Sequence, residues 1–534
     1  MNKLFNSKLL LNISILIVLF FLSIVIRFDN LKDPMGRHHE WLTGHVLSTI
    51  YTLDKDGAAS HYFSPTWTFN TEADRYVQSF STFKDKNNFT YYVSYPPMCF
   101  LLPHFLLKLT GGSSLIGIRV IGLIIQFFTG IFIFLIVHSL FKRKIGQDVF
   151  IPSFAAFFLY TFASGNLWFH GHIFFADMIV PLFITGFLWA LLKTLDNEWN
   201  MKKSLIILAV FTFLGAYTEW QMLFLVYFAG IFFAIKGFKE KKYFLYFFVL
   251  GFTACLAVFL TYFQYSLIAG FDELVKVVQA KYTQRSGADA SAEAGLSMKN
   301  SFSFINISDH YERNFSTLLD YAWYCLLLFA SCLAINKFLG GEKIGRKPFL
   351  IMGLVLLSIL THHYVFFNFT TVHDFSTLKT ALLLTLISGV AIGYFYVSFI
   401  DNKSKHLVYG ALLLITLSIY FHFSTKEYYR VNSPRLLTNF HPMVGAIVKK
   451  HVNENEILVC SGTVTPETSW YAKRNILIAN SLPEALFYLK QINSKLNGTF
   501  IKMNVEDYEI YKFNTNGDTL SYYKEGFGNV NLDN

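Results

Sequence analysis

Residues 97–109 read PMCFLLPHFLLKL, and this segment decides how many times the chain crosses a membrane. The segment is apolar, but it is only about 13 residues long and Pro103 interrupts it. A helix that spans a bilayer needs about 20 apolar residues, and an internal proline kinks or breaks a helix. We therefore expect a short helix at the outer surface of a membrane. If the segment crossed instead, every basic loop after it would lie outside.

The connections between the other apolar runs are of two kinds. One kind is rich in Lys and Arg, at 142–144, 202–203, 236–242, 337–347 and 403–405. The other kind carries His, Asp, Glu and Trp, at 168–172, 219–221, 362–363 and 373–374. Positive residues stay on the cytoplasmic side of a bilayer, so the second kind emerges on the outer face. Polar groups that gather on one face of a membrane bundle indicate a site.

The composition excludes a soluble globular chain, because 53% of the residues are hydrophobic and only 15% are charged. The formal net charge of +10 comes mostly from the basic loops, so it gives no reason to expect a nucleic-acid partner. The five cysteines are scattered over apolar runs and the C-terminal region. Such a scatter fits neither a disulfide framework nor a zinc ribbon.

We predict a polytopic α-helical membrane protein with about eleven transmembrane helices. The predicted spans are 9–27, 114–141, 150–165, 175–195, 204–218, 221–236, 243–268, 318–336, 348–366, 376–400 and 406–423. The first span follows Lys3 and Lys8 and lacks a small-residue cleavage site, which indicates an uncleaved anchor. The N-terminus is then cytoplasmic and the C-terminus extracytoplasmic. Usage rich in Lys, Asn and Phe is typical of AT-rich bacterial genomes, so we expect a bacterial inner membrane.

Two domains are predicted. Residues 1–428 form the transmembrane domain, with large outer loops at 28–113 and 269–317. Residues 429–534 form a small extracytoplasmic α/β domain that lies over the bundle. Its predicted strands are 456–460, 475–479 and 499–503, and its predicted helix is 483–496.

The first outer loop opens with three acids, Asp29, Asp33 and Glu40, and two adjacent histidines, His38 and His39. The apolar stripe after residue 41 predicts a helix along the membrane surface, with Glu40 in its first turn. The glycine at position 44 leaves space above that carboxylate. Partial shelter raises the pKa of a carboxyl towards that of a useful general base. The alternative is that the acids are solvated or cap helices.

The sequence Tyr95-Pro96-Pro97, followed by an apolar half-helix and preceded by a long acidic loop, resembles the C-type (GT-C) membrane glycosyltransferases. The branch it resembles holds the protein O-mannosyltransferases and the lipid A aminoarabinose transferases. Arg119, Asp177 and the stretch 470–474 (WYAKR) are similar to features of that branch. One departure is that relatives place an Asp-Glu pair early in the loop, where this chain has His-Glu at 39–40.

The resemblance implies an inverting transfer of a sugar from a polyprenyl-phosphate donor to a lipid, glycan or protein acceptor at the outer face. The chemistry needs a carboxylate base and cationic donors for the departing phosphate. Glu40 is the first choice of base, Asp33 the second and Asp29 the third. The candidate substrate-binding residues are His38, His39, Arg119, His172, Asp177, Glu219, His362, His363, His373 and Asp374. For the arginine the alternative is an interfacial anchor, and for the acids and histidines it is a capping or solvated role.

We expect no cofactor, and polyprenyl-phosphate sugar, acceptor and membrane lipids as the partners. A divalent metal is the alternative, because His-His, His-x-His and His-Asp pairs lie on one face, although none has the spacing of a zinc-hydrolase motif. A surface-polysaccharide polymerase or ligase that uses lipid-linked oligosaccharides is a second functional reading. A transporter is a third, but its ionisable groups usually lie near the bilayer midplane between internal repeats, and no repeat is evident here.

Overall fold

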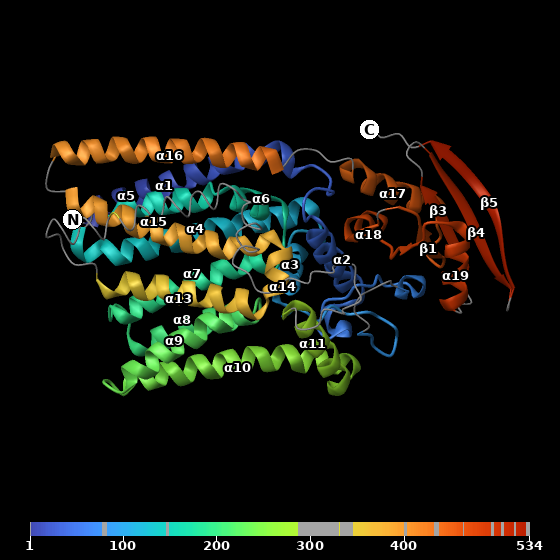
Figure 1. Ribbon diagram of the computed structural model, residues 1–534, viewed down its shortest axis with the longest axis horizontal. Helices are drawn as coiled ribbons and strands as arrows, with labels where there is room; N and C mark the ends of the chain where they lie inside the picture. The colour runs from blue at the N-terminus through green and yellow to red at the C-terminus, as the bar shows by residue number, and fades with distance from the viewer. Residues whose placement is uncertain are drawn as a thin grey trace.

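The computed structural model describes residues 2–76, 83–145, 149–286, 331, 345–399, 403–431, 437–462, 464–492, 496–503, 507–516 and 519–529. Long helices lie side by side in a bundle, and a small domain with a β-sheet lies at one end of it (Figure 1). The N-terminus lies near the opposite end of the bundle. The short helices α2 (Trp41–Asp56) and α3 (Met98–Lys108) lie between the bundle and the sheet domain.

The bundle is built from apolar helices. They are α1 (Asn2–Arg27), α4 (Leu115–Ile145), α5 (Phe150–Thr161), α6 (Ser164–His172), α7 (Ala176–Leu195), α8 (Met201–Ala216), α9 (Gln221–Gly237), α10 (Lys242–Ala269), α13 (Arg346–Val365), α15 (Thr377–Phe399) and α16 (Lys403–Val431). Phe187, Leu225 and Val355 are buried in their common core. The outward faces are apolar too, since Phe252 on α10 is 70% exposed. Such stripes are expected where lipid surrounds a helix, and the chain is an integral membrane protein.

Seven helices among the described residues are long and apolar enough to cross a membrane, or eight if the bent pair α5–α6 counts as one span. The predicted number of about eleven is not confirmed. Helices α8 and α9, which correspond to two predicted spans, have only 16 and 17 residues. The predicted span 318–336 lies outside the described residues apart from position 331. Residues 97–109, expected to be too short to cross, form the 11-residue helix α3.

The third predicted span, 150–165, was wrong at its outer end. Helix α5 ends at Thr161, α6 begins at Ser164, and the two helices are bent by 59°. Residues 168–172 are therefore helical, where the sequence suggested a loop. Side-chain amides satisfy the carbonyls freed at this break, because Asn166 donates to the Tyr160 carbonyl at 2.7 Å and Gln126 to the Thr161 carbonyl at 3.1 Å.

The C-terminal domain contains one five-stranded sheet in the order β2-β1-β3-β4-β5. Strands β1, β2 and β3 pair in parallel, and β3, β4 and β5 pair antiparallel. The elements are α17 (Leu437–His451), β1 (Ile457–Cys460), α18 (Pro466–Ala472), β2 (Leu477–Ile478), α19 (Leu482–Ile492), β3 (Gly498–Met503), β4 (Asp507–Asn516) and β5 (Thr519–Asn529). The first three strands lie at the predicted positions, whereas β4 and β5 were not predicted. Helix α16 continues to Val431, past residue 428.

The first loop and the C-terminal domain are joined by specific contacts. Asp74 accepts hydrogen bonds from Arg474 Nε and the backbone N–H of Asn475, both at 2.8 Å. A Cβ atom on Gly44 would lie 2.7 Å from the backbone nitrogen of Glu467. The space predicted above Glu40 is therefore filled, because the glycine lets helix α18 approach α2. Burial raises the pKa of the Glu467 carboxyl to about 7.

Three further short elements complete the end of the bundle that faces the sheet domain. Helix α11 (Phe271–Ser286) follows α10 at the start of the second large loop, whose later residues, 287–317, lie outside the described residues. Helix α14 (Phe367–Val372) and the 3-10 helix η4 (Asp374–Ser376) connect α13 to α15. This connection brings Asp374 to the first loop.

Candidate functional site

Glu40 lies at the centre of a polar group that we call the first-loop cluster, formed by Asp33, Arg37, Glu40, Arg119 and His172. Its carboxylate accepts hydrogen bonds from the backbone N–H groups of Gly36 and Arg37, both at 2.9 Å. Arg119 Nη2 donates to its other oxygen at 2.6 Å. Glu40 directly precedes helix α2 and is fully buried, so it holds the loop and the arginine in place.

The pKa of Glu40 is shifted opposite to the sequence-based expectation. Burial alone would raise this pKa, but His172, Arg119 and the backbone N–H of Arg37 lower it to about 2. The reason for the difference is that the carboxylate is fully enclosed with a cation, whereas the sequence suggested a half-sheltered acid. A carboxylate with so low a pKa is a weak base at neutral pH.

Arg37 and Arg119 both have guanidinium N–H groups that lack a hydrogen-bond partner in the described part of the chain. Arg119 Nη1 donates to the carbonyls of Leu31 and Asp33 at 2.8 and 2.7 Å, but its Nε donates to nothing among the described residues. Arg37 Nη2 donates to Asp33 at 2.5 Å, and its Nε and Nη1 have no described partner. The two side chains are 4% and 1% exposed. Buried N–H groups of this kind are suited to an anion with several acceptor oxygens.

The other two first-loop acids are more accessible than Glu40. The Asp33 side chain is 35% exposed and is paired with Arg37. Asp29 lies in the 3-10 helix η1 (Phe28–Leu31) and is exposed. The structure thus brings Asp33 and Glu40 into one cluster through two arginines, while Asp29 remains at the surface beside it.

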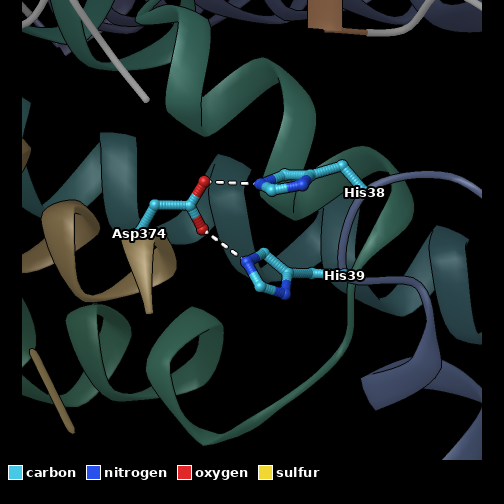
Figure 2. A group of neighbouring side chains, drawn as sticks. All are labelled: His38, His39 and Asp374. Atoms are coloured by element: carbon cyan, nitrogen blue, oxygen red, sulfur yellow. Dashed lines mark hydrogen bonds and ion pairs between the residues drawn. The ribbon is translucent and has the colours of Figure 1, made fainter. Parts of the chain in front are cut away.

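His38 and His39 both reach one carboxylate, that of Asp374 (Figure 2). The Nε2 atom of His38 lies 2.5 Å from Asp374 Oδ2, and the Nε2 atom of His39 lies 2.7 Å from Asp374 Oδ1. The backbone of His39 is left-handed, with φ of 60°. Adjacent side chains usually point apart, so this rare conformation is what lets both imidazoles face the same group. Together the three residues form the histidine pair site.

The histidine pair site has the ligand types of a metal centre, since its three ligand atoms lie within 4.8 Å of one another. The hydrogen bonding around it favours protons instead. Trp41 Nε1 donates to His39 Nδ1 at 3.2 Å, so the proton of a neutral His39 ring is on Nε2, facing Asp374. Ligation of a metal through that Nε2 would require the opposite tautomer. The expectation of no metal stays a prediction.

Two more predicted residues border these clusters. His172 Nδ1 lies 3.7 Å from Glu40 Oε1, and its Nε2 shares a 3.1 Å hydrogen bond with the Tyr428 hydroxyl. The His373 ring is stacked on Phe375 at 4.9 Å and lies 6.1 Å from the His39 ring, centroid to centroid. His172 therefore borders the first-loop cluster, and His373 borders the histidine pair site.

The remaining predicted residues belong to a separate group, the bundle cluster, formed by Asp177, Glu219, His362 and Lys379. Lys379 Nζ lies 2.7 Å from Asp177 Oδ1 and 3.4 Å from Glu219 Oε1. His362 Nε2 lies 3.0 Å from the same Glu219 oxygen. All four side chains are at most 1% exposed. His363 is adjacent and also buried, with its ring centroid 6.0 Å from that of His362.

A chain of aromatic rings extends from the histidine pair site. Phe175 contacts Tyr95 and Phe375 with centroid distances of 5.0 and 6.5 Å, and Phe375 in turn lies 5.3 Å from the His39 ring. Asp374 and Lys379 come from the same short stretch at the start of α15, yet each belongs to a different group. The structure thus distributes most of the predicted site residues over three polar groups, which are the first-loop cluster, the histidine pair site and the bundle cluster.

Sequence reasoning missed Arg37 and Lys379. Arg37 stands between the predicted residues in the loop, so its neighbours were a usable signal. Lys379 is embedded in the predicted span 376–400, where an isolated lysine is costly unless it is paired. That cost was also a usable signal, because the charged partners Asp177 and Glu219 were already candidates.

No protein-family model and no curated protein sequence matches the chain. Among solved structures, the chain is similar to the oligosaccharyltransferase AglB from Archaeoglobus fulgidus in complex with an inhibitory peptide and a dolichol-phosphate. The TM-score is 0.57 at 11% identity, over 92% of this chain and 70% of that chain. It is also similar to ArnT from Cupriavidus metallidurans bound to undecaprenyl phosphate, with a TM-score of 0.54 at 10% identity, over 93% of both chains. The predicted resemblance to the GT-C glycosyltransferases is confirmed at the level of the fold.

Proposed function

We propose that this chain is a membrane glycosyltransferase that moves a sugar from a polyprenyl-phosphate-linked donor to a lipid, glycan or protein acceptor. The proposal is supported by the fold, because AglB and ArnT share it and their structures hold a dolichol-phosphate and undecaprenyl phosphate. The reaction takes place at the outer face of a bacterial inner membrane, with the N-terminus cytoplasmic. The position of the sheet domain and the N-terminus at opposite ends of the bundle supports this orientation.

The observation that carries the proposal is the pair of buried arginines with unpaired N–H groups. A buried donor without a partner costs about 1–3 kcal/mol, so a protein rarely keeps several together without a ligand. Among the described residues, Arg37 Nε and Nη1 and Arg119 Nε have no hydrogen-bond partner. The phosphate of a polyprenyl-phosphate sugar supplies acceptor oxygens and a negative charge. The same contacts strengthen as charge develops on the departing phosphate, which is what lowers a reaction barrier.

The displacement inverts the anomeric configuration, because an acceptor oxygen attacks the face opposite the departing phosphate. A base must take the acceptor proton, and the sequence assigns this role to a first-loop carboxylate. Glu40 and Asp33 are each paired with an arginine, so either would have to weaken that pair to act as base. Asp29 is exposed and lies further along the loop. The proposed mechanism uses no metal ion, as expected from the sequence.

The proposal is tested by incubating the purified protein in detergent with a panel of labelled polyprenyl-phosphate sugars and measuring the release of polyprenyl phosphate. We expect release from at least one donor. Arg37→Met and Arg119→Met should lower it by at least about tenfold, which corresponds to the loss of about 1.4 kcal/mol of phosphate binding. Lys32→Met is the matched control, since Lys32 is an exposed cation of the same loop, and its release should equal that of the native chain.

Two results would contradict the proposal. One is that the native protein releases polyprenyl phosphate from none of the donors. The other is that folded Arg37→Met protein retains full release; if that variant does not fold, Arg37→Lys, which keeps the charge beside Asp33, takes its place.

A second candidate is a ligase or polymerase that transfers a whole oligosaccharide. The similarity to an oligosaccharyltransferase supports this function. The chain covers 69% of that protein in its apo form, at a TM-score of 0.56 and 9% identity. A lipid-linked oligosaccharide in the donor panel distinguishes the two. Preference for this donor over every single-sugar donor would support the ligase.

A further inference from the structure

His38 and His39 are bound to the same carboxylate but differ at the other ring nitrogen. The Nδ1 atom of His39 accepts a hydrogen bond from Trp41 Nε1 at 3.2 Å. An indole nitrogen can only donate, so this contact fixes Nδ1 of His39 as an acceptor and occupies it. Both nitrogens of His39 are therefore engaged, one by Trp41 and one beside Asp374.

The Nδ1 atom of His38 has no hydrogen-bond partner among the described residues. On the other side of the ring, Nε2 lies 2.5 Å from Asp374 Oδ2. An ionised carboxylate can only accept, so the proton of the neutral His38 ring is on Nε2 and the lone pair is on Nδ1. The His38 side chain is 23% exposed, compared with 15% for His39 and 2% for Asp374. Of the three groups, His38 is the one that presents an open proton acceptor.

We infer that His38 is the general base of the transfer, with Asp374 as the positioning residue that fixes its tautomer. The inference rests on the proposed function. It assigns the role of general base to an imidazole instead of a first-loop carboxylate. In the step, the acceptor oxygen forms a bond to the anomeric carbon while the bond from that carbon to the phosphate oxygen breaks. The electron pair leaves with the phosphate, and the acceptor proton moves to Nδ1 of His38.

The surroundings of His38 suit this role better than those of the acids. Its imidazolium would be formed beside the buried carboxylate of Asp374, which compensates the new charge. Glu40 and Asp33, in contrast, are ion-paired with Arg119 and Arg37. The titratable and charged groups around the histidine pair site are Asp374 and His373 from the segment before α15, and Arg37, His39 and Glu40 from the loop itself.

The test compares two nucleophiles in the detergent assay, water and azide ion, with the labelled donor that the native protein uses. Water must lose a proton to a base when it attacks, whereas azide carries no proton and forms a glycosyl azide without one. We expect His38→Gln to lower hydrolysis by about 10²- to 10⁴-fold and to leave azide transfer unchanged. The matched control His39→Gln removes a neighbour on the same carboxylate and should lower hydrolysis by less than tenfold.

Asp374→Asn tests the positioning role separately. It should lower hydrolysis, spare azide transfer, and move the acid limb of the hydrolysis pH profile to lower pH, because the imidazolium loses its counter-charge. A purely structural role would lower both reactions together and leave that limb in place. If the variants do not fold, the native protein still decides. Its hydrolysis should fall at acid pH while azide transfer should not, because only hydrolysis needs a base without a proton.

Three results would overturn the inference. The first is His38→Gln hydrolysis at the native rate. The second is an equal loss of both reactions in His38→Gln and His39→Gln. The third is a stoichiometric divalent metal in the purified protein that both variants lose, which would make the cluster a metal site. If the native protein were inactive with every donor, the proposed function itself would be contradicted. That outcome differs from the three results above, which contradict only the assignment of His38 as the base.

Discussion

The first-loop cluster and the bundle cluster both bury carboxylates beside a cation, but they leave different groups unpaired. In the bundle cluster, Lys379 lies between Asp177 and Glu219, and the side chains are at most 1% exposed. In the first-loop cluster, the arginines have N–H groups without a described partner, and the adjacent His38, which is 23% exposed, has no described partner at Nδ1. Buried charge alone therefore does not identify a reaction site. Among the described residues, the buried atoms that lack a hydrogen bond are guanidinium N–H donors in the first-loop cluster, whereas in the bundle cluster they include Asp177 Oδ2 and His362 Nδ1.

The largest expected effect comes from removing the internal cation of the bundle cluster. Lys379→Met would leave two buried carboxylates without compensation, which destabilises a protein by about 3–5 kcal/mol. Thermal unfolding in detergent measures this loss. Lys276→Met is the control, because Lys276 forms an exposed pair with Glu273 and its removal should leave the unfolding temperature unchanged. Native stability of Lys379→Met would mean that the bundle cluster is not a closed ion-pair network.

A somewhat smaller effect is expected for the first-loop cluster. The pKa of Glu40 is lowered from 4.5 to about 2, so its ionisation stabilises the fold by about 3 kcal/mol above pH 4.5. This contribution is lost as the pH falls through about 2. Glu40→Gln should therefore unfold more readily than the native protein at pH 7, and the difference should shrink below pH 4.5. A difference that stays constant with pH would show that Glu40 acts through packing rather than charge.

The first loop contacts the C-terminal domain through helices α2 and α18. Gly44→Val would push a side chain into the backbone of Glu467, and overpacking of this kind costs about 1–3 kcal/mol. Release of polyprenyl phosphate should fall along with stability, because the first loop loses its contact with α18. Gly353→Ala is the control, since a Cβ there meets no atom within 4 Å. If Gly44→Val and Gly353→Ala lost equal stability and equal release of polyprenyl phosphate, the contact between the first loop and the C-terminal domain would not matter.

A pH dependence is expected at that same contact. The pKa of Glu467 is raised to about 7 by burial, so the folded state favours its protonated form. This stabilisation is fully present below pH 4.5 and is lost as the pH rises through about 7. Glu467→Gln should be more stable than the native protein at pH 8 by about 3 kcal/mol, from a pKa raised from 4.5 to about 7, and equal to it at pH 4.5. Resistance of the C-terminal domain to protease across this pH range measures the difference in stability. A difference between the two proteins that does not change with pH would contradict the prediction.

Local sequence patterns were sufficient to predict the fold class. The alternation of basic and polar loops, the short segment at 97–109 and the strand patterns near 457 and 499 all depend on a few neighbouring residues. These features predicted the bundle, the surface helix and the start of the sheet. The bend between α5 and α6 was not predicted, because it depends on amides that satisfy the broken helix from outside it.

The chemistry of the site was harder to predict, because it depends on contacts between distant residues. The low pKa of Glu40 requires Arg119, which is 79 positions away, and the contact of His38 requires Asp374, which is 336 positions away. The sequence suggested which residues gather on one face. It did not indicate that these residues form three groups, because the ion pairs that define each group join residues far apart in the chain.

The most direct test of the account is where the lipid phosphate binds. A cryo-electron microscopy structure of the protein with undecaprenyl phosphate should place the phosphate within hydrogen-bond distance of Arg37 Nε or Nη1 and Arg119 Nε, beside His38. A phosphate bound instead to Lys379 in the bundle cluster would contradict the account and reverse the roles of the two groups.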